Sequence, residues 1–125
     1  KPSTIYTHFN NDLNIDHQLT SRAVATATRP LPNEKNVNIY HFETFSSTEW
    51  SFSKKEQSFC PNVFFQLDQD DITAKKKGMT EYSSELRDWP HPRSLKNLEI
   101  TANRWGAVVG LNYVEAFQLV RSVVN

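Results

Sequence analysis

TIYTHFNNDLNIDH, residues 4–17, places a β-type run, a polar cluster and a helix start one after another. The run 4–9 is rich in β-branched and aromatic residues, which predicts a short strand. The cluster 10–14 predicts a loop, and the helix after it has Asp16 as its expected N-cap. The predicted inner face of that helix consists of Leu19, Ala23, Val24 and Ala27. A strand that leads through a loop into a helix is typical of α/β folds.

The middle of the chain continues this alternation. Residues 37–42 predict a second strand, and the short apolar run 63–67 predicts a third strand that is buried on both faces. The acidic residues that follow favour a helix start, because they meet the positive end of the helix dipole. The helix that they open carries an apolar stripe of Ile72, Met79, Tyr82 and Leu86.

The C-terminal part of the chain predicts one long helix and one strand. Ser94 is the expected cap of the helix, which ends near Gly110. Its apolar stripe consists of Leu95, Leu98, Ala102, Trp105 and Val109. Residues 113–120 favour an extended strand at a sheet edge. The predicted order is therefore β-α-β-β-α-α-β, which indicates a layered α/β fold.

The composition excludes several classes of function. The chain has 125 residues, which is the usual size of one domain. It carries 14 basic and 14 acidic residues, and this balance argues against a nucleic-acid binder, which needs a basic surface. The chain has 3 glycines and no glycine-rich motif, which excludes a phosphate-binding loop. The single cysteine, Cys60, fits a reducing, cytoplasmic location, and no apolar run approaches the roughly 20 residues of a membrane span.

The densest polar group is the run 12–17, which follows a predicted strand and precedes a predicted helix. In open α/β sheets this is where ligands bind. His17 is a candidate metal ligand, and Asp16 is the neighbouring carboxylate that would orient its ring. The alternative is that Asp16 only caps the helix and that His17 is an ordinary first-turn residue. These residues alone are too few for a catalytic zinc, which takes three protein ligands.

The other histidines are scattered along the sequence. His8 and His41 lie in predicted strands, where a histidine is more often packed than functional. His91 lies between two prolines in PHPRS, residues 90–94, and the restricted backbone would hold His91 and Arg93 in defined directions. The alternative is a rigid turn between two helices, in which Ser94 caps the second helix.

Five stretches, in the same order along nearly the whole chain, resemble the PIG-L (LmbE-like) family of zinc-dependent deacetylases. Residues 7–17 resemble the second metal motif of the family. The other four are SSTEW at 46–50, PNVF at 61–64 with the helix after it, PHPRS at 90–94, and a C-terminal signature from RWGA at 104–107 to YVEAF at 113–117. The resemblance implies a Rossmann-like, three-layer α/β fold, of which residues 1–125 are the C-terminal half of a single domain.

The resemblance also implies a reaction, the removal of an acetyl group from an N-acetylated amino sugar or its conjugate, with Zn²⁺ as cofactor. In the family, the zinc is held by a His and an Asp of an H-P-D-D-E-like motif and by the His of the second motif. His17 stands at the position of that last ligand, and Asp16 at that of its neighbouring carboxylate. Zinc would polarise the acetamide carbonyl and supply a hydroxide-like water, and a carboxylate of the first motif would act as general base.

The sequence departs from the family pattern at two points. It contains no H-P-D-D-E, so two zinc ligands and the general base lie outside it. Many members have a His three residues before the ligand His, where this chain has Asn14, which can donate a hydrogen bond to an oxyanion but cannot supply a proton. The expected site has His17 as metal ligand, Asp16 and His91 as catalytic residues, and Asp12, Asn14 and Arg93 as substrate-binding residues.

Two functions follow from these observations. The first is a zinc-dependent N-deacetylase, whose partners are the N-acetylated sugar and either the missing N-terminal half or a second copy of the chain. The second is a non-catalytic binding or interaction module, because the chain retains a single zinc ligand. Neither function involves nucleic acid or a membrane span.

Overall fold

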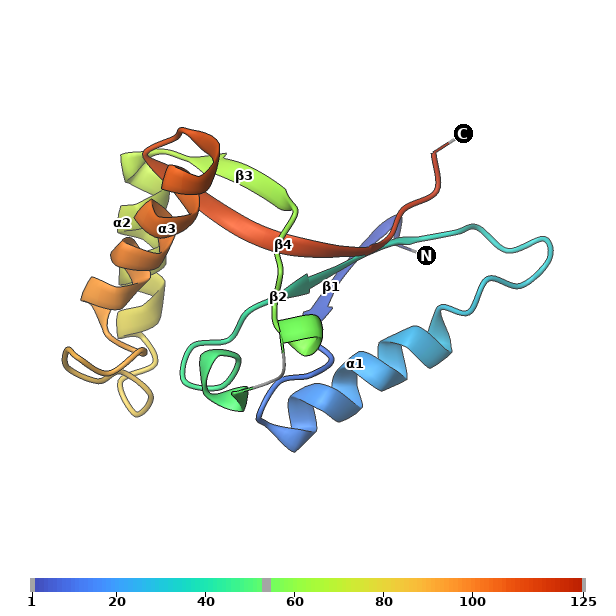
Figure 1. The fold of residues 1–125 in the computed structure, drawn as a ribbon, viewed down its shortest axis with the longest axis horizontal. Coiled ribbons are helices and arrows are strands. Elements are labelled where there is room, and N and C mark those ends of the chain that lie inside the picture. The colour runs from blue at the N-terminus through green and yellow to red at the C-terminus, as the bar shows by residue number, and fades with distance from the viewer. Residues whose placement is uncertain (1, 53–54, 125) are drawn as a thin grey trace. The chain divides into compact units, whose positions relative to one another are not determined.

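The computed structural model describes residues 2–52 and 55–124. Its helices and strands follow one another as β1 (Thr4–His8), α1 (Ile15–Ala27), β2 (Asn38–Phe42), β3 (Val63–Leu67), α2 (Gln69–Thr80), α3 (Leu95–Val109) and β4 (Tyr113–Arg121) (Figure 1). Two short 3₁₀ turns, η1 (Glu49–Ser51) and η2 (Lys55–Gln57), lie between β2 and β3. This order confirms the predicted alternation and the mixed α/β class. Among the described residues, no helix has the length and apolar character needed to cross a membrane.

The strands form one mixed sheet with the order β1-β2-β4-β3. β1 and β2 are parallel, with Thr4 beside Asn38 and His8 beside Phe42, whereas β2 and β4 are antiparallel. The prediction that residues 113–120 form an edge strand is wrong, because β4 has a hydrogen-bonded strand on each side. Val114, Ala116 and Phe117 of this strand are buried.

The chain divides into two compact units, and β4 contributes residues to both. The first unit comprises the described residues up to Val63 together with those from Phe117 onward, and the second unit comprises Phe64–Ala116. The hypothesis that residues 1–125 are the C-terminal half of one larger domain stays a prediction.

The first unit buries both apolar and polar side chains. Its apolar core contains Phe9, Val37, Ile39 and Phe117. α1 packs against β1, and the Ser21 hydroxyl of this helix lies 3.1 Å from Nε2 of the buried His41. Thr7 lies beside His41 in the strand register and is also buried. Thr7 Oγ1 and His41 Nδ1 have no hydrogen-bond partner among the described residues.

α1 presents a different face to the strands from the one that the sequence predicts. Leu19, Ala23 and Ala27 are exposed, and the buried residue of the helix is Ser21. His17, Val24 and Thr28 are half-buried on the same side as Ser21, at intervals of three and four residues. The expected inner face is therefore wrong for Leu19, Ala23 and Ala27 and right for Val24. Ser21, with its polar partner His41, occupies a position on the inner face that apolar periodicity would assign to a large side chain.

The second unit is built around α2 and α3, which pack against each other. Its buried apolar residues are Ile72, Leu98, Ala102, Val114 and Ala116. The prediction that residues 63–67 are buried on both faces is wrong, because none of the five residues of β3 is buried and Phe65 is 43% exposed. α2 ends at Thr80, so Tyr82 and Leu86 of the expected stripe lie beyond the helix.

Capping residues set the limits of both helices in the second unit. Asp68 and Asp71 form a reciprocal capping box at the start of α2, where each side chain accepts from the backbone of the other. Ser94 Oγ accepts a hydrogen bond from Asn97 N–H at the start of α3, which confirms the predicted cap. Gly110 ends α3 with a φ of 76°, in the left-handed region that glycine tolerates.

Candidate functional site

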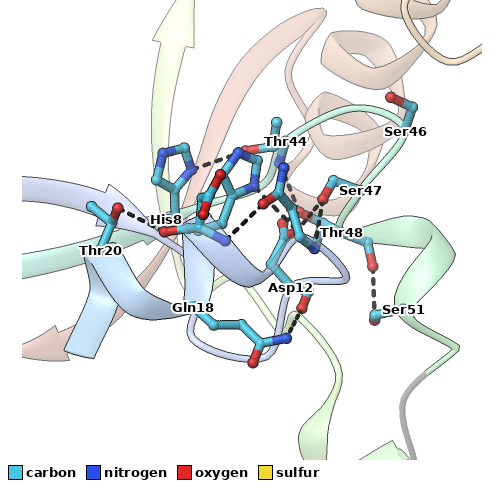
Figure 2. A network of polar contacts seen from close by, with 12 residues as sticks. His8, Asp12, Gln18, Thr20, Thr44, Ser46, Ser47, Thr48 and Ser51 are labelled. Atoms are coloured by element: carbon cyan, nitrogen blue, oxygen red, sulfur yellow. Dashed lines mark hydrogen bonds and ion pairs between the residues drawn. The ribbon is translucent and has the colours of Figure 1, made fainter. Parts of the chain in front are cut away.

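A polar network in the first unit joins the end of β1, the start of α1 and the turn after β2 (Figure 2). Asp12 is at its centre and is 1% exposed. Its carboxylate accepts hydrogen bonds from the Ser47 hydroxyl, from the Thr48 hydroxyl at 2.8 Å and from the Asn14 N–H at 2.9 Å. These donors satisfy a charge that would otherwise be costly to bury.

The hydrogen bonds around Asp12 decide its protonation state. Burial alone would raise the pKa of this carboxyl, because desolvation disfavours the charged form. The hydrogen bonds from Ser47, Asn14 and Thr48, together with the nearby His17 ring, outweigh burial and hold the pKa below its ordinary value. Asp12 is therefore a carboxylate at neutral pH.

The turn after β2 brings the two hydroxyl groups to Asp12. Within residues 44–48, the Thr48 N–H donates to the Thr44 carbonyl at 2.9 Å, and the Thr44 N–H donates to Thr48 Oγ1 at 2.7 Å. Ser46, within this turn, adopts a φ of 63°, in the left-handed region. As Figure 2 shows, the turn directs Ser47 and Thr48 toward the carboxylate of Asp12.

His17 is the ring that Asp12 orients. Nδ1 of His17 lies 3.2 Å from Oδ1 of Asp12, and the side chain is half-buried at the first turn of α1. Because an ionised carboxylate can only accept, Nδ1 carries the proton in the neutral ring and the lone pair is on Nε2. A carboxylate on one nitrogen with the other nitrogen available is the usual arrangement of a histidine that ligates a metal.

His8 at the end of β1 stacks on His17. The ring centroids are 3.9 Å apart and the planes are 1° from parallel. Nδ1 of His8 lies 3.3 Å from the Thr44 hydroxyl. Burial, and then the neighbouring His17 ring, lower the pKa of His8, although Asp12 acts in the opposite direction. The in-plane lone pairs of the two rings lie in parallel planes and do not converge, so the two rings cannot both ligate one ion in the plane of the ring.

The expected roles of Asp16 and Asn14 change in the structure. The carboxylate that contacts His17 is Asp12 and not Asp16, whose side chain is exposed on the outer side of the first turn. Asn14 and not Asp16 is the N-cap of α1, because the Asn14 side-chain oxygen accepts from the Asp16 N–H at 2.8 Å. A catalytic role for Asp16 and a substrate contact by Asn14 stay predictions.

His91 and Arg93 belong to the second unit, where they lie in a turn that is held by internal hydrogen bonds. Nδ1 of His91 accepts from the Arg93 N–H at 3.0 Å, and the Arg93 guanidinium pairs with Glu85. The Arg93 carbonyl accepts from the Arg87 N–H at 3.0 Å. These contacts, with Ser94 as helix cap, agree with the alternative stated for this segment, a rigid turn between two helices. Catalysis by His91 and substrate binding by Arg93 stay predictions.

Sequence reasoning missed His8, Ser47 and Thr48 as members of this network. His8 was indistinguishable from a packed strand residue because its contact with His17 forms only when α1 folds back on β1. The signal for the turn is the hydroxyl-rich run at 44–48, which supplies donors for a buried carboxylate. Nothing local pairs that run with Asp12, which is 35 residues away from Ser47.

Within residues 2–52 and 55–124, no group of three His, Cys, Asp or Glu side chains is placed to hold a metal ion. The described residues therefore provide one oriented histidine, backed by one carboxylate.

Comparisons with known proteins bear on the fold alone. No protein-family model matches the sequence, and no curated protein matches it. The structure is similar to that of the conserved protein TT1542 from Thermus thermophilus, with a TM-score of 0.70 and 17% sequence identity. The similarity covers 99% of this chain and 54% of that chain, so this chain spans about half the length of the solved structure. The arrangement of helices and strands is therefore one that a longer protein of known structure also contains.

Proposed function

We propose that this chain is part of a zinc-dependent hydrolase with a Rossmann-like, LmbE-type fold, which removes an acetyl group from an N-acetylated amino sugar. The observation that carries the proposal is the contact between His17 and the buried Asp12. It supports a ligand role for His17 because a carboxylate on Nδ1 fixes the tautomer that leaves Nε2 for the metal. The resemblance of residues 7–17 to the second metal motif of the deacetylases points to the same residue.

His17 and its surroundings suit one zinc ligand. A catalytic zinc takes three protein ligands, so this site requires two more ligands besides His17. The family pattern assigns these ligands and the general base to an H-P-D-D-E motif, which the sequence lacks. The greater length of the structural neighbour agrees with a site to which more polypeptide contributes.

The residues of the network each have a task in this proposal. Asp12 holds the proton on His17 Nδ1 and keeps the ring in place, and Ser47 and Thr48 hold Asp12. His8 covers one face of the His17 ring and so excludes water from it. When bound, zinc would polarise the acetamide carbonyl of the substrate and make its bound water resemble hydroxide. Asp12 stabilises the positive charge that the His17 ring acquires by donating to the metal.

The test uses the full polypeptide that carries this chain together with an H-P-D-D-E motif. Acetate released from N-acetylglucosamine is measured with Zn²⁺ present, and bound zinc is measured by elemental analysis after dialysis. His17→Ala should abolish both signals, whereas Thr20→Ala, an exposed change on the same helix, should leave both unchanged. Acetate release that survives in His17→Ala would contradict the proposal.

A binding module without catalysis is the second candidate. It is favoured by the absence of any three-ligand group among the residues that the structure describes. If it is correct, the 125-residue chain binds zinc weakly through His17, and no polypeptide that contains it releases acetate. Zinc-dependent turnover in the full polypeptide would exclude it.

A further inference from the structure

A polar cavity of about 250 Å³ lies in the first unit, apart from the Asp12–His17 network. We call it the carboxamide pocket, because four of its lining residues carry a side-chain amide: Asn10, Asn11, Gln57 and Gln118. Glu56 and Ser58 also line it, and none of Asp12, His17, Ser47 and Thr48 does. The pocket is therefore separate from the site to which we assign the hydrolysis.

The residues that line the pocket can hydrogen-bond to the hydroxyl groups of a ligand and do not suit an anionic ligand. A carboxamide both donates and accepts hydrogen bonds, as a hydroxyl does, so amides and hydroxyls satisfy each other in pairs. The described residues that line the pocket include no Lys, Arg or His, and they include the carboxylate-bearing Glu56. A phosphate or carboxylate would find no cation among them and would be repelled by Glu56.

Hydrogen bonds hold two of the side chains that line the pocket, those of Asn11 and Gln118. The Asn11 side-chain amide donates to the Gln57 carbonyl at 2.9 Å, which ties the loop after β1 to η2. Oε1 of Gln118 accepts from the Cys60 N–H at 3.3 Å, so the amide hydrogens of Gln118 are the part of this group that a ligand can use. Phe9 lines the pocket with a buried ring, which packs edge-on against Phe59. Side chains that are already held lose less entropy when a ligand binds.

The size of the pocket suits a single ring. Sites for drug-sized molecules enclose roughly 300–1,000 Å³, and this cavity is smaller than that range. A ring with several hydroxyls and no anionic group suits both the volume and the lining.

We propose that the carboxamide pocket binds one uncharged sugar ring through the amides of Asn10, Gln57 and Gln118. Glu56 accepts a hydrogen bond from a ring hydroxyl and weakens the binding of phosphorylated sugars. This binding needs neither zinc nor the hydrolytic step, so it stands or falls independently of the function proposed above.

The test is a titration of the ¹⁵N-labelled 125-residue chain, followed by NMR in a chelator so that the zinc site plays no part. N-acetylglucosamine should shift the backbone amide signals of Asn10, Gln57 and Gln118. N-acetylglucosamine 6-phosphate should bind roughly fourfold more weakly, because its charge faces Glu56. Shifts that appear only at Asp12, His17 and Ser47, or no shifts at all, would overturn the proposal.

A pair of variants isolates the role of Glu56. Glu56→Gln removes the charge from an exposed side chain and should bring the affinities for the two sugars together. Glu34→Gln removes the same charge from an exposed residue that does not line this pocket, and should preserve the difference. Equal effects of the two variants would contradict discrimination by Glu56.

Discussion

The buried carboxylate of Asp12 has a structural task that can be separated from any catalytic one. Asp12→Asn keeps the size of the side chain but turns one acceptor into a donor, which then faces the hydroxyls of Ser47 and Thr48. We expect the free energy of unfolding to fall by about 1–3 kcal/mol, the usual effect of an unsatisfied buried polar group. Urea unfolding of the 125-residue chain measures it. Asp16→Asn, at an exposed position, is the control and should stay within about 0.5 kcal/mol of the wild type.

Thr7 and Ser21 are both buried, but only one of them is hydrogen-bonded through its side chain. Thr7 Oγ1 has no partner among the described residues, whereas Ser21 Oγ meets His41 Nε2. Thr7→Val should therefore leave the free energy of unfolding unchanged or raise it by up to about 1 kcal/mol. Ser21→Ala should lower it by about 1 kcal/mol. The thermal unfolding temperature should fall for Ser21→Ala and should not fall for Thr7→Val, and equal losses would contradict this account.

His41 makes the stability of the first unit depend on pH. Its burial lowers the pKa of the folded state below 6.5, the ordinary value. The unfolded chain consequently takes up the proton at a higher pH than the folded chain does. Stability is complete above pH 6.5 and is lost as the pH falls toward the lower folded-state pKa.

Urea unfolding at several pH values between about 5 and 8 tests this dependence. The wild type should lose stability toward the acidic end, and His41→Asn should lose less, because the titrating group is gone. Part of the dependence should remain in the variant, since burial also lowers the pKa of His8. A pH dependence that is identical in His41→Asn and the wild type would show that His41 is not responsible.

At the scale of the elements, two glycines in helices should respond in opposite ways to the same substitution. A Cβ on Gly106 in α3 would meet the Leu111 carbonyl oxygen at 2.4 Å and that of Asn112 at 2.8 Å, and neither backbone atom can move easily. A Cβ on Gly78 in α2 would meet nothing within 4 Å. Gly106→Ala should destabilise the chain, whereas Gly78→Ala should stabilise it by about 0.5–1 kcal/mol, the difference between the two residues in a helix. Thermal unfolding compares them directly, and stabilisation by Gly106→Ala would contradict the close approach.

The elements were more predictable from the sequence than the surfaces on which they pack. Local signals predicted β1, α3 with its Ser94 and Gly110 ends, and the alternating order of strands and helices, because capping and β-propensity act over a few residues. The inner face of α1 was missed because a polar residue, Ser21, faces the strands. The place of β4 inside the sheet was missed because it depends on pairing with distant strands.

At the scale of the whole molecule, some residues of the candidate site could be predicted from local sequence signals, and others could not because they depend on the tertiary fold. His17 and Asp12 lie five residues apart, and both were singled out from the sequence. The identity of the orienting carboxylate was not predictable, because the loop carries Asp12 to the buried side and leaves Asp16 exposed. Ser47, Thr48 and His8 join the site only through the tertiary fold. The metal and the substrate remain proposals that rest on the resemblance and on the oriented His17.

During synthesis on the ribosome, the second unit is complete before the first unit, although the first unit contains the start of the chain. Phe64–Ala116 is one continuous stretch, so the second unit can fold as soon as that stretch emerges. The first unit begins earlier in the chain, but its fold also includes the residues from Phe117 onward, which contain the part of β4 that pairs with β2. Until they are translated, that side of β2 remains an unpaired strand edge, which is where nascent chains associate wrongly. The time needed to translate the residues between β2 and β4 therefore sets how long the growing chain is exposed to misassembly.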